Sequence, residues 1–377
     1  MRLSCLQENF SRGLAVVGRA VATRTTLPIT QNVHISTDRS QLKLSATNLE
    51  IAISTWVGAQ IEEEGSVTIP ARILTEFVNS IPQDKIVLKS GEQPASIDLE
   101  CARFEAHING TDPESFPPIP SVESGVVCKV DPKGLRDAID RVAFAAATEE
   151  SRPVLTGIKV EISGDEFTFA AADGFRLAVY TGKLEEPSEE DLSFIIPSRA
   201  LQEISRLIGS QENSIELTVT PSKSQALFRL DNIEVVTQLI EGSFPNYSQL
   251  IPKSYDTRAI VSPSEFRRAN KAASIFARDG SGIVRINVTG NPDGGIGKIA
   301  ISSRADELGE NLGEIDAKVE GNEAKIALNN KYLEDVLDVF EEDEIALEIT
   351  SPSSPGVLKP VSGDQYVHVV MPMFVQW

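Results

Sequence analysis

The sequence predicts an α+β protein made of three tandem repeats, each with about two helices packed on antiparallel sheets. Three observations predict this fold class. A helix-entry segment recurs at intervals of about 130 residues, an amphipathic helix heads each interval, and short alternating segments follow each helix. With 377 residues the chain has room for several cores. We expect domains at residues 1–125, 126–255 and 256–377.

The first helix of each repeat is predicted from apolar residues at helical spacing. The three segments are FSRGLAVVGRAVA from residue 10, LRDAIDRVAFAAA from residue 135 and FRRANKAASIFA from residue 266. Each leads into segments with the alternation of a half-buried strand. The first of these strand segments are NVHIST, GIKVEIS and GIVRINVTG.

The second helix of each repeat begins at the recurring segment. Its copies are IPAR at 69–72, IPSR at 196–199 and the fainter LNNKYLEDV at 328–336. We expect Pro70 and Pro197 at the first helical position, where a missing N–H is tolerated. The alternating segments DKIVLKS, NSIELTVT and DEIALEIT follow, and Pro-rich connectors begin at Phe116 and Phe244.

The composition bounds the class of protein. Hydrophobic residues make up 41% and charged residues 24% of the chain, so neither disorder nor a fibre is indicated. No apolar run approaches the roughly 18 residues of a membrane span, and the N-terminus lacks an apolar signal core. The three cysteines are far apart, without CxxC spacing, as suits a reducing compartment. We expect a cytoplasmic protein without a disulfide framework.

The net charge of −20 alone argues against a nucleic-acid binder. Acids concentrate in IEEEG, LEEPSEED and FEEDE, however, whereas the predicted helices carry their basic residues mainly on one face. Such faces are most often only solvated, but recurrence in three repeats favours a shared surface. With few aromatic residues nearby, we expect weak, phosphate-directed contact with duplex, blind to sequence. The basic residues are Arg12, Arg19, Arg72, Lys133, Arg136, Arg141, Arg199, Arg206, Arg267, Arg268, Lys271 and Lys331.

Motifs of catalysis are missing from the sequence. GNPDGGIGKIA contains a Gly-Lys pair, but Pro292 and Ile299 stand where a phosphate-binding loop needs Gly and Ser or Thr. His34, His107 and His368 are isolated and follow no metal-ligand spacing. We expect a protein that is not an enzyme and that holds neither a cofactor nor a metal.

Seven short segments, in order along the chain, together resemble one bacterial family. They are RTTLPI at 24–29, ATNLEI at 46–51, IPAR at 69–72, SRPVLTG at 151–157, ADGFRLAV at 172–179, EGSFPNY at 241–247 and VVMPM at 369–373. This family is the DNA polymerase III beta subunit, the sliding clamps. The resemblance implies the DNA-clamp fold and a ring formed by a head-to-tail dimer.

The function follows from the resemblance as an expectation. A ring around duplex DNA holds it by topology, so the clamp would be a processivity factor that tethers the replicative polymerase without chemistry of its own. The implied partners are double-stranded DNA of any sequence, a second copy of the chain, the polymerase catalytic subunit, the clamp loader and other proteins with clamp-binding peptides. No membrane is implied.

The resemblance also implies the site residues. Arg24, in a loop that faces DNA in the family, is a candidate DNA contact with Arg72, Arg152 and Arg199. At the dimer joint the apolar candidates are Phe104, Ile275 and Phe276. The partner-peptide groove would be formed by Arg152, Val154, Leu155, Ala172, Gly174, Phe175, Arg176, Leu177, Pro245, Gln249, Leu250, Val369, Val370, Met371, Pro372 and Met373.

Two departures and four alternatives stay open. The chain continues as FVQW after VVMPM, and Phe175 stands where some members have a polar His, so the partner preference is unsettled. Taken alone, VVMPM could be an edge strand with core methionines, and ADGFRLAV a hairpin turn at Asp173 and Gly174. The sequence is also compatible with a metal-dependent repeat nuclease or hydrolase and with a protein-only scaffold.

Overall fold

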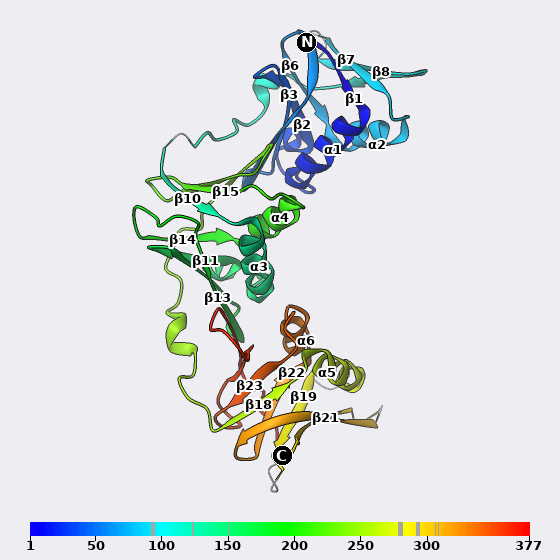
Figure 1. The fold of residues 1–377 in the computed structure, drawn as a ribbon. Helices are drawn as coiled ribbons and strands as arrows, with labels where there is room; N and C mark the ends of the chain where they lie inside the picture. Colours follow the sequence, from blue (N-terminus) through cyan, green and yellow to red (C-terminus); the bar gives the residue numbers. More distant parts are fainter. Residues whose placement is uncertain are drawn as a thin grey trace. The chain divides into compact units, whose positions relative to one another are not determined.

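The computed structural model describes residues 1–377 except 92–94, 123, 150, 278–281, 292–294, 306 and 308. Its helices and antiparallel sheets confirm the α+β class and the three repeats (Figure 1). Repeat 1 contains β1–β9 with α1 and α2, repeat 2 contains β10–β17 with α3 and α4, and repeat 3 contains β18–β25 with α5 and α6. Contacts divide the chain into two compact units. Unit 1 is Met1–Pro132, Glu185–Glu189 and Glu203–Leu239, and unit 2 is Lys133–Leu184, Glu190–Gln202 and Ile240–Trp377.

Unit 1 contains two antiparallel sheets. The five-stranded sheet runs in the order β5 (Ala59–Glu63), β1 (Arg2–Leu6), β7 (Lys85–Gly91), β8 (Ser96–Cys101), β9 (Phe104–Asn109). The eight-stranded sheet runs β10 (Val126–Val130), β15 (Ile215–Val219), β16 (Gln225–Arg229), β17 (Ile233–Gln238), β4 (Ile51–Val57), β3 (Gln41–Thr47), β2 (Asn32–Asp38), β6 (Ser66–Pro70). Its helices are α1 (Gln7–Val17) and α2 (Ala71–Ser80).

Unit 2 contains one continuous twelve-stranded sheet. Its order is β14 (Leu192–Pro197), β11 (Gly157–Ser163), β12 (Glu166–Ala172), β13 (Arg176–Lys183), β25 (Tyr366–Val370), β24 (Gly356–Pro360), β23 (Ile345–Ile349), β18 (Thr257–Val261), β21 (Gly309–Gly321), β20 (Gly297–Ala305), β19 (Ile283–Thr289), β22 (Ala324–Asn329). Its helices are α3 (Pro132–Val142), α5 (Pro263–Ala277) and α6 (Asn330–Asp338), and the division between the units passes through α4 (Ser198–Ile208).

The helices form because their apolar residues recur with helical spacing. In α1 the buried positions Gln7, Phe10, Leu14 and Val17 lie on one face, which packs on β4 and β3. Helix α6 starts where the side chain of Asn329 accepts hydrogen bonds from the backbone N–H groups of Lys331 (2.9 Å) and Tyr332 (3.4 Å). Each fully buried Leu or Phe side chain contributes about 1.5–3 kcal/mol of hydrophobic free energy.

Three local expectations are corrected by the structure. A short strand, β1, β10 or β18, precedes the first helix of each repeat, so no repeat begins with a helix. Pro70 and Pro197 end strands immediately before the second helices, whereas Pro132 and Pro263 are the residues at a first helical position. The VVMPM strand, β25, is not an edge strand, because it lies between β13 and β24.

The repeats and the compact units do not coincide, for a physical reason. Strand β17 of repeat 2 pairs with β4 of repeat 1, and β25 of repeat 3 pairs with β13 of repeat 2. Backbone hydrogen bonds therefore continue the eight-stranded and the twelve-stranded sheet from one repeat into the next, and the strands of repeat 2 are shared between the two units. This pairing brings distant segments of the sequence together at the candidate site.

Candidate functional site

The ADGFRLAV and VVMPM segments lie side by side in unit 2. Arg176 of β13 is paired with Val370 of β25, and Leu177 with Val369. Beyond the end of the strand, the N–H of Met371 still donates to the carbonyl oxygen of Phe175 at 2.8 Å. The structure thus places Phe175 and Met371 next to each other although they are far apart in the sequence.

A tight turn at Asp173 fixes the position of Phe175. One carboxylate oxygen of Asp173 accepts hydrogen bonds from the N–H groups of Phe175 (2.8 Å) and Arg176 (3.0 Å), which forms an Asx turn. Gly174 has φ +96°, the left-handed region that favours glycine. A Cβ there would lie 3.3 Å from both terminal guanidinium nitrogens of Arg152, which donates to the Asp173 carbonyl at 3.3 Å. The expected turn at Asp173 and Gly174 is present.

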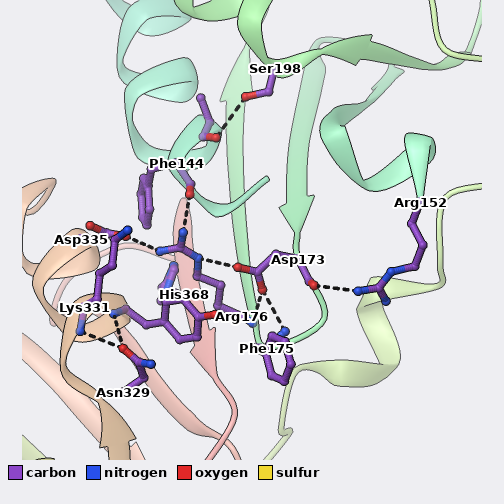
Figure 2. A network of polar contacts seen from close by, with 12 residues as sticks. Phe144, Arg152, Asp173, Phe175, Arg176, Ser198, Asn329, Lys331, Asp335 and His368 are labelled. Carbon is purple, nitrogen blue, oxygen red and sulfur yellow. Dashed lines mark hydrogen bonds and ion pairs between the residues drawn. The ribbon is translucent and has the colours of Figure 1, made fainter. Parts of the chain in front are cut away.

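Arg176 is the centre of a partly buried polar network (Figure 2). Its guanidinium donates to Asp173 (3.0 Å), to Asp335 of α6 (2.5 Å) and to the carbonyl oxygen of Phe144 (2.7 Å). It also lies over the ring of Tyr332, 4.6 Å from the centroid. Its side chain is only 9% exposed, and its contact with Asp335 joins β13 to repeat 3.

His368 of β25 lies under this network and is uncharged. It is fully buried, and its ring stacks on that of Phe144 with centroids 5.4 Å apart. Burial, and secondarily the positive charge of Arg176, lowers the pKa of His368 to about 3. Protonation of this imidazole at low pH therefore opposes the folded state.

The connector between repeats 2 and 3 packs beside the same two segments of unit 2. Phe244, Tyr247 and Ile251 pack against the apolar cluster of Ala172, Leu177, Val357 and Val369. The Tyr247 hydroxyl donates to Glu161 at 2.5 Å, and burial together with this carboxylate raises the pKa of Tyr247. Gly242 has φ +136°, and a Cβ there would be 2.6 Å from a methyl carbon of Val154, so the connector runs close over the SRPVLTG segment.

The predicted groove residues divide into a buried floor and an exposed rim. The floor contains Leu155, Ala172, Leu177, Val369 and Val370, each at most 7% exposed. On the rim, Phe175, Leu250 and Met371 are 58%, 49% and 42% exposed. The others are the exposed Arg152, Gly174, Pro245 and Gln249 and the half-buried Val154, Arg176, Pro372 and Met373. An apolar floor with a flexible methionine at the rim suits an apolar peptide side chain.

The sequence did not single out Tyr332, Asp335 and Phe144. The Tyr332 ring stacks on that of Phe175 with centroids 6.4 Å apart, so it belongs to the rim. Tyr332 and Asp335 lie in the third copy of the recurring helix, and this position was the available signal. Phe144, in the 3-10 turn after α3, carried no signal of its own.

Many of the basic residues predicted to face DNA have acidic neighbours. Ion pairs join Arg12 to Glu8 (3.0 Å), Arg72 to Glu76 (2.9 Å), Arg19 to Glu203 (3.0 Å), Arg141 to Glu342 (2.8 Å) and Arg267 to Asp338 (2.8 Å). A hydrogen bond from Arg72 to Glu76 raises the pKa of Arg72. Of the four DNA-facing candidates, Arg24 and Arg199 are exposed, and Arg152 donates to the Asp173 carbonyl.

The three candidates for the dimer joint lie on two elements. Phe104 begins β9, the last strand of the five-stranded sheet, and is 48% exposed. Ile275 and Phe276 lie in the last turn of α5, where Ile275 is 57% exposed and Phe276 half-buried. These apolar side chains gain hydrophobic free energy only if another surface covers them.

The described residues include no cluster of three or more His, Cys, Asp or Glu side chains that could hold a metal ion. In the same residues, no helix has both the length and the apolar character of a membrane span.

Comparisons with known proteins agree over the whole chain. Family models of the DNA polymerase III beta subunit match three stretches, the N-terminal domain at residues 1–120, the central domain at 129–246 and the C-terminal domain at 248–374. The beta sliding clamp of Staphylococcus epidermidis is 30% identical over 382 residues, covering 99% of each chain. That of Synechocystis is 29% identical over 393 residues with the same coverage.

Solved structures give the same result. The DNA polymerase sliding clamp of Bacillus subtilis superposes with a TM-score of 0.94 at 26% identity, covering all of both chains. The DNA polymerase III beta chain of Streptococcus pneumoniae gives 0.92 at 27% identity, covering 99% of this chain and all of the other.

Proposed function

Because the chain belongs to the bacterial DNA polymerase III beta subunit family, we propose that two copies close a ring around duplex DNA and tether the replicative polymerase. The protein is a sliding clamp and processivity factor, a non-catalytic accessory subunit of the polymerase. Bacterial replication takes place in the cytoplasm, so we assign the protein to that compartment. The predicted domains 1–125, 126–255 and 256–377 are kept as the three clamp domains.

One observation carries this function: two junctions between repeats use equivalent strands. At both, the last strand of a repeat pairs with the fourth strand of the repeat before it, β17 with β4 and β25 with β13. The equivalent strands that would make a third junction are β9 of repeat 1 and β21 of repeat 3. β9 ends its sheet, and in the described residues β21 pairs with β18 only through Lys318–Gly321. A second copy can supply the missing strand at each end.

The existing junctions give the register of the third. Ile233 starts β17 and lies opposite Thr55. The two residues before Ile233 form a turn closed by the hydrogen bond from the Leu230 N–H to the Ile233 carbonyl oxygen, and the two residues before Phe104 form the corresponding turn, closed by the pairing of Phe104 with Cys101. The position in β21 that corresponds to Thr55 is Gly313, which pairs with the buried Ile301 of β20. We therefore expect Phe104 to lie over Gly313 of the second copy, where no side chain obstructs the aromatic ring.

The first helices support the same joint. Gln7, Pro132 and Pro263 are the first residues of α1, α3 and α5, and at an equal distance beyond them come Arg19, Phe144 and Ile275. Arg19 forms an ion pair with Glu203 of repeat 2, and the ring of Phe144 stacks on that of His368 of repeat 3. This position contacts the next repeat at both junctions, so Ile275, with Phe276 beside it, should contact repeat 1 of the second copy.

Contact with DNA would be weak and non-specific. A net charge of −20 and internal ion pairs limit the cations available for DNA. Of the four candidates, Arg24 and Arg199 are exposed, whereas Arg72 would have to exchange Glu76, and Arg152 the Asp173 carbonyl, for a phosphate. Each phosphate contact of this kind is weakened by salt. Retention would then depend on the closed ring, and weak contacts leave the ring able to slide.

The groove of unit 2 would dock the partners. Its apolar floor and its rim of Phe175, Leu250 and Met371 suit a short peptide with leucine and phenylalanine anchors, as in the polymerase catalytic subunit, the clamp loader and other partners. Two or three anchors at roughly 1.5–3 kcal/mol each give about micromolar affinity. Partners held so weakly can exchange.

The test is retention on DNA of different topology. Protein loaded onto nicked circular DNA should stay bound in high salt and leave when a restriction enzyme cuts the circle. Equal release from circle and line would favour the protein-only scaffold, and metal-dependent cleavage of the DNA would favour the nuclease.

A further inference from the structure

Unit 1 repeats the turn that shapes the groove of unit 2. One side-chain oxygen of Asn48 accepts hydrogen bonds from the N–H groups of Glu50 (3.0 Å) and Ile51 (2.9 Å), as Asp173 does from Phe175 and Arg176. The residue after Asn48 is Leu49, with φ +77°, where the groove has Gly174 with φ +96°. ATNLEI and ADGFRLAV therefore form the same turn.

The surrounding backbone matches as well. The N–H of Gln238 donates to the Glu50 carbonyl at 2.9 Å, as that of Met371 donates to Phe175 at 2.8 Å. The N–H of Ala22 donates to the Thr30 carbonyl at 3.1 Å, as that of Ala147 donates to Leu155 at 2.8 Å. Unit 1 also has an apolar cluster of Val122, Leu227 and Val236. Leu227 pairs with Val236 there as Val357 pairs with Val369 in the cluster of unit 2.

The side chains carried by this shared backbone differ between the two units. The position that corresponds to Arg152 is Leu27, and the one that corresponds to Gly174 is Leu49. In unit 2 the guanidinium of Arg152 lies against Gly174. The matching backbone puts Leu27 and Leu49 at the same two positions, with a shorter, apolar side chain at residue 27. Leu27 is 42% and Leu49 53% exposed, and neither serves the core. Where the groove has an arginine and a glycine, unit 1 thus presents two leucines.

The backbone of Leu49 is strained. A bulky residue at positive φ is rare, because its Cβ approaches the neighbouring carbonyl oxygen, and glycine or asparagine relieves the strain. Strained conformations that persist on a surface often mark a binding site. The strain holds an apolar side chain outward, in contact with water, and a ligand that covers it would compensate.

We propose that Leu27 and Leu49 form a second docking surface for short peptides of the class that the groove binds. The proposal rests on the proposed function of the groove. Because the turn and the backbone hydrogen bonds around it are the same in both units, we take the occupant to be of the same kind, an extended segment with leucine or phenylalanine anchors. Arg24, exposed and three residues before Leu27, favours an acidic residue beside the anchor. Leu49 fills space that Gly174 leaves open, so binding should be at least about tenfold weaker than in the groove.

The experiment uses the full chain and a labelled octapeptide. The peptide carries a leucine, one glutamate and a photoreactive benzoyl-phenylalanine, and crosslinked residues are mapped by mass spectrometry across a concentration series. We expect crosslinks around Met371 at low concentration and a second set around Leu27 and Leu49 at about tenfold higher concentration. Leu27→Ser with Leu49→Gly should remove the second set alone, and Leu49→Gly also relieves the strain. Leu6→Ser, at another exposed leucine of unit 1, is the matched control.

The outcomes separate the two proposals. Crosslinks confined to the groove, or a second set that survives Leu27→Ser with Leu49→Gly, would overturn the second surface and leave the groove standing. If the unsubstituted chain gave the crosslinks around Leu27 and Leu49 but none around Met371, the groove assignment would be overturned instead. A change of oligomeric mass in the Leu27→Ser, Leu49→Gly variant would assign the surface to a second copy and also overturn the peptide proposal.

Discussion

The guanidinium of Arg176 and the carboxylate of Asp335 form a 2.5 Å ion pair that joins strand β13 to helix α6. At the corresponding position repeat 1 has Ile51, which is 6% exposed and needs no counter-ion. We predict that Arg176→Ile lowers the free energy of unfolding by about 2–4 kcal/mol, because Asp173 and Asp335 lose their counter-ion in a partly buried place. Denaturant unfolding of the full chain measures this loss.

The matched control lies on the same strand. Lys183 pairs with Asp165 at 3.2 Å but is 68% exposed, so Lys183→Ile should change the free energy of unfolding by less than about 0.5 kcal/mol. If the two variants lost stability equally, the network around Arg176 would not stabilise the fold in the way described.

Protonation of His368 should lower the free energy of unfolding as the pH is lowered. Its pKa is lowered from 6.5 to about 3 in the folded chain, so below pH 6.5 the unfolded chain binds a proton that the folded chain does not. The contribution is complete above pH 6.5 and is lost as the pH falls toward 3. Between pH 7 and pH 5 the wild type should lose about 2 kcal/mol more than His368→Gln. His34, whose pKa burial also lowers, is present in both proteins and cancels. If the free energies of unfolding of the wild type and His368→Gln changed equally with pH, the lowered pKa of His368 would be refuted.

Peptide binding should depend on the rim of the groove. Leu177 is 2% exposed, so changing it would damage the fold, whereas Phe175 and Met371 are accessible. Phe175→Ala with Met371→Ala should weaken binding of a labelled clamp-binding peptide by about tenfold or more, which is 1.4 kcal/mol or more, without loss of folded structure. Val127→Ala, at an exposed residue of unit 1, is the control. Unchanged affinity in the double variant would place the peptide elsewhere.

Substitutions in the last turn of α5 should change the mass at which the protein sediments. One chain has a mass of 40.9 kDa, and two copies should sediment together. Ile275→Ala with Phe276→Ala removes apolar surface from the proposed joint and should shift the population toward the single-chain mass. Ile296→Ala, at a 66% exposed residue of the same repeat, should leave the dimer unchanged. A dimer that survives the double substitution at micromolar concentration would move the joint away from α5.

The sequence predicted what depends on local periodicity. The helices were found because their buried residues recur every three or four positions, and the turn at Asp173 because Asp-Gly is a local signal. The strands before the first helices were missed because five residues such as Arg2–Leu6 show little alternation. The Arg176 network could not be found this way, since Asp335 is 159 residues and Phe144 32 residues away, and only the pairing of β13 with β25 brings them together.

A covalently closed joint tests the ring most directly. In Phe104→Cys with Gly313→Cys, the proposed register places the two thiols on facing strands of different copies, while the native cysteines are buried. After loading onto nicked circular DNA and treatment with a short bis-maleimide, we expect a protein–DNA complex that survives SDS and is released when the DNA is linearised. Crosslinked protein that leaves the intact circle in SDS, or no crosslink between copies, would contradict the ring.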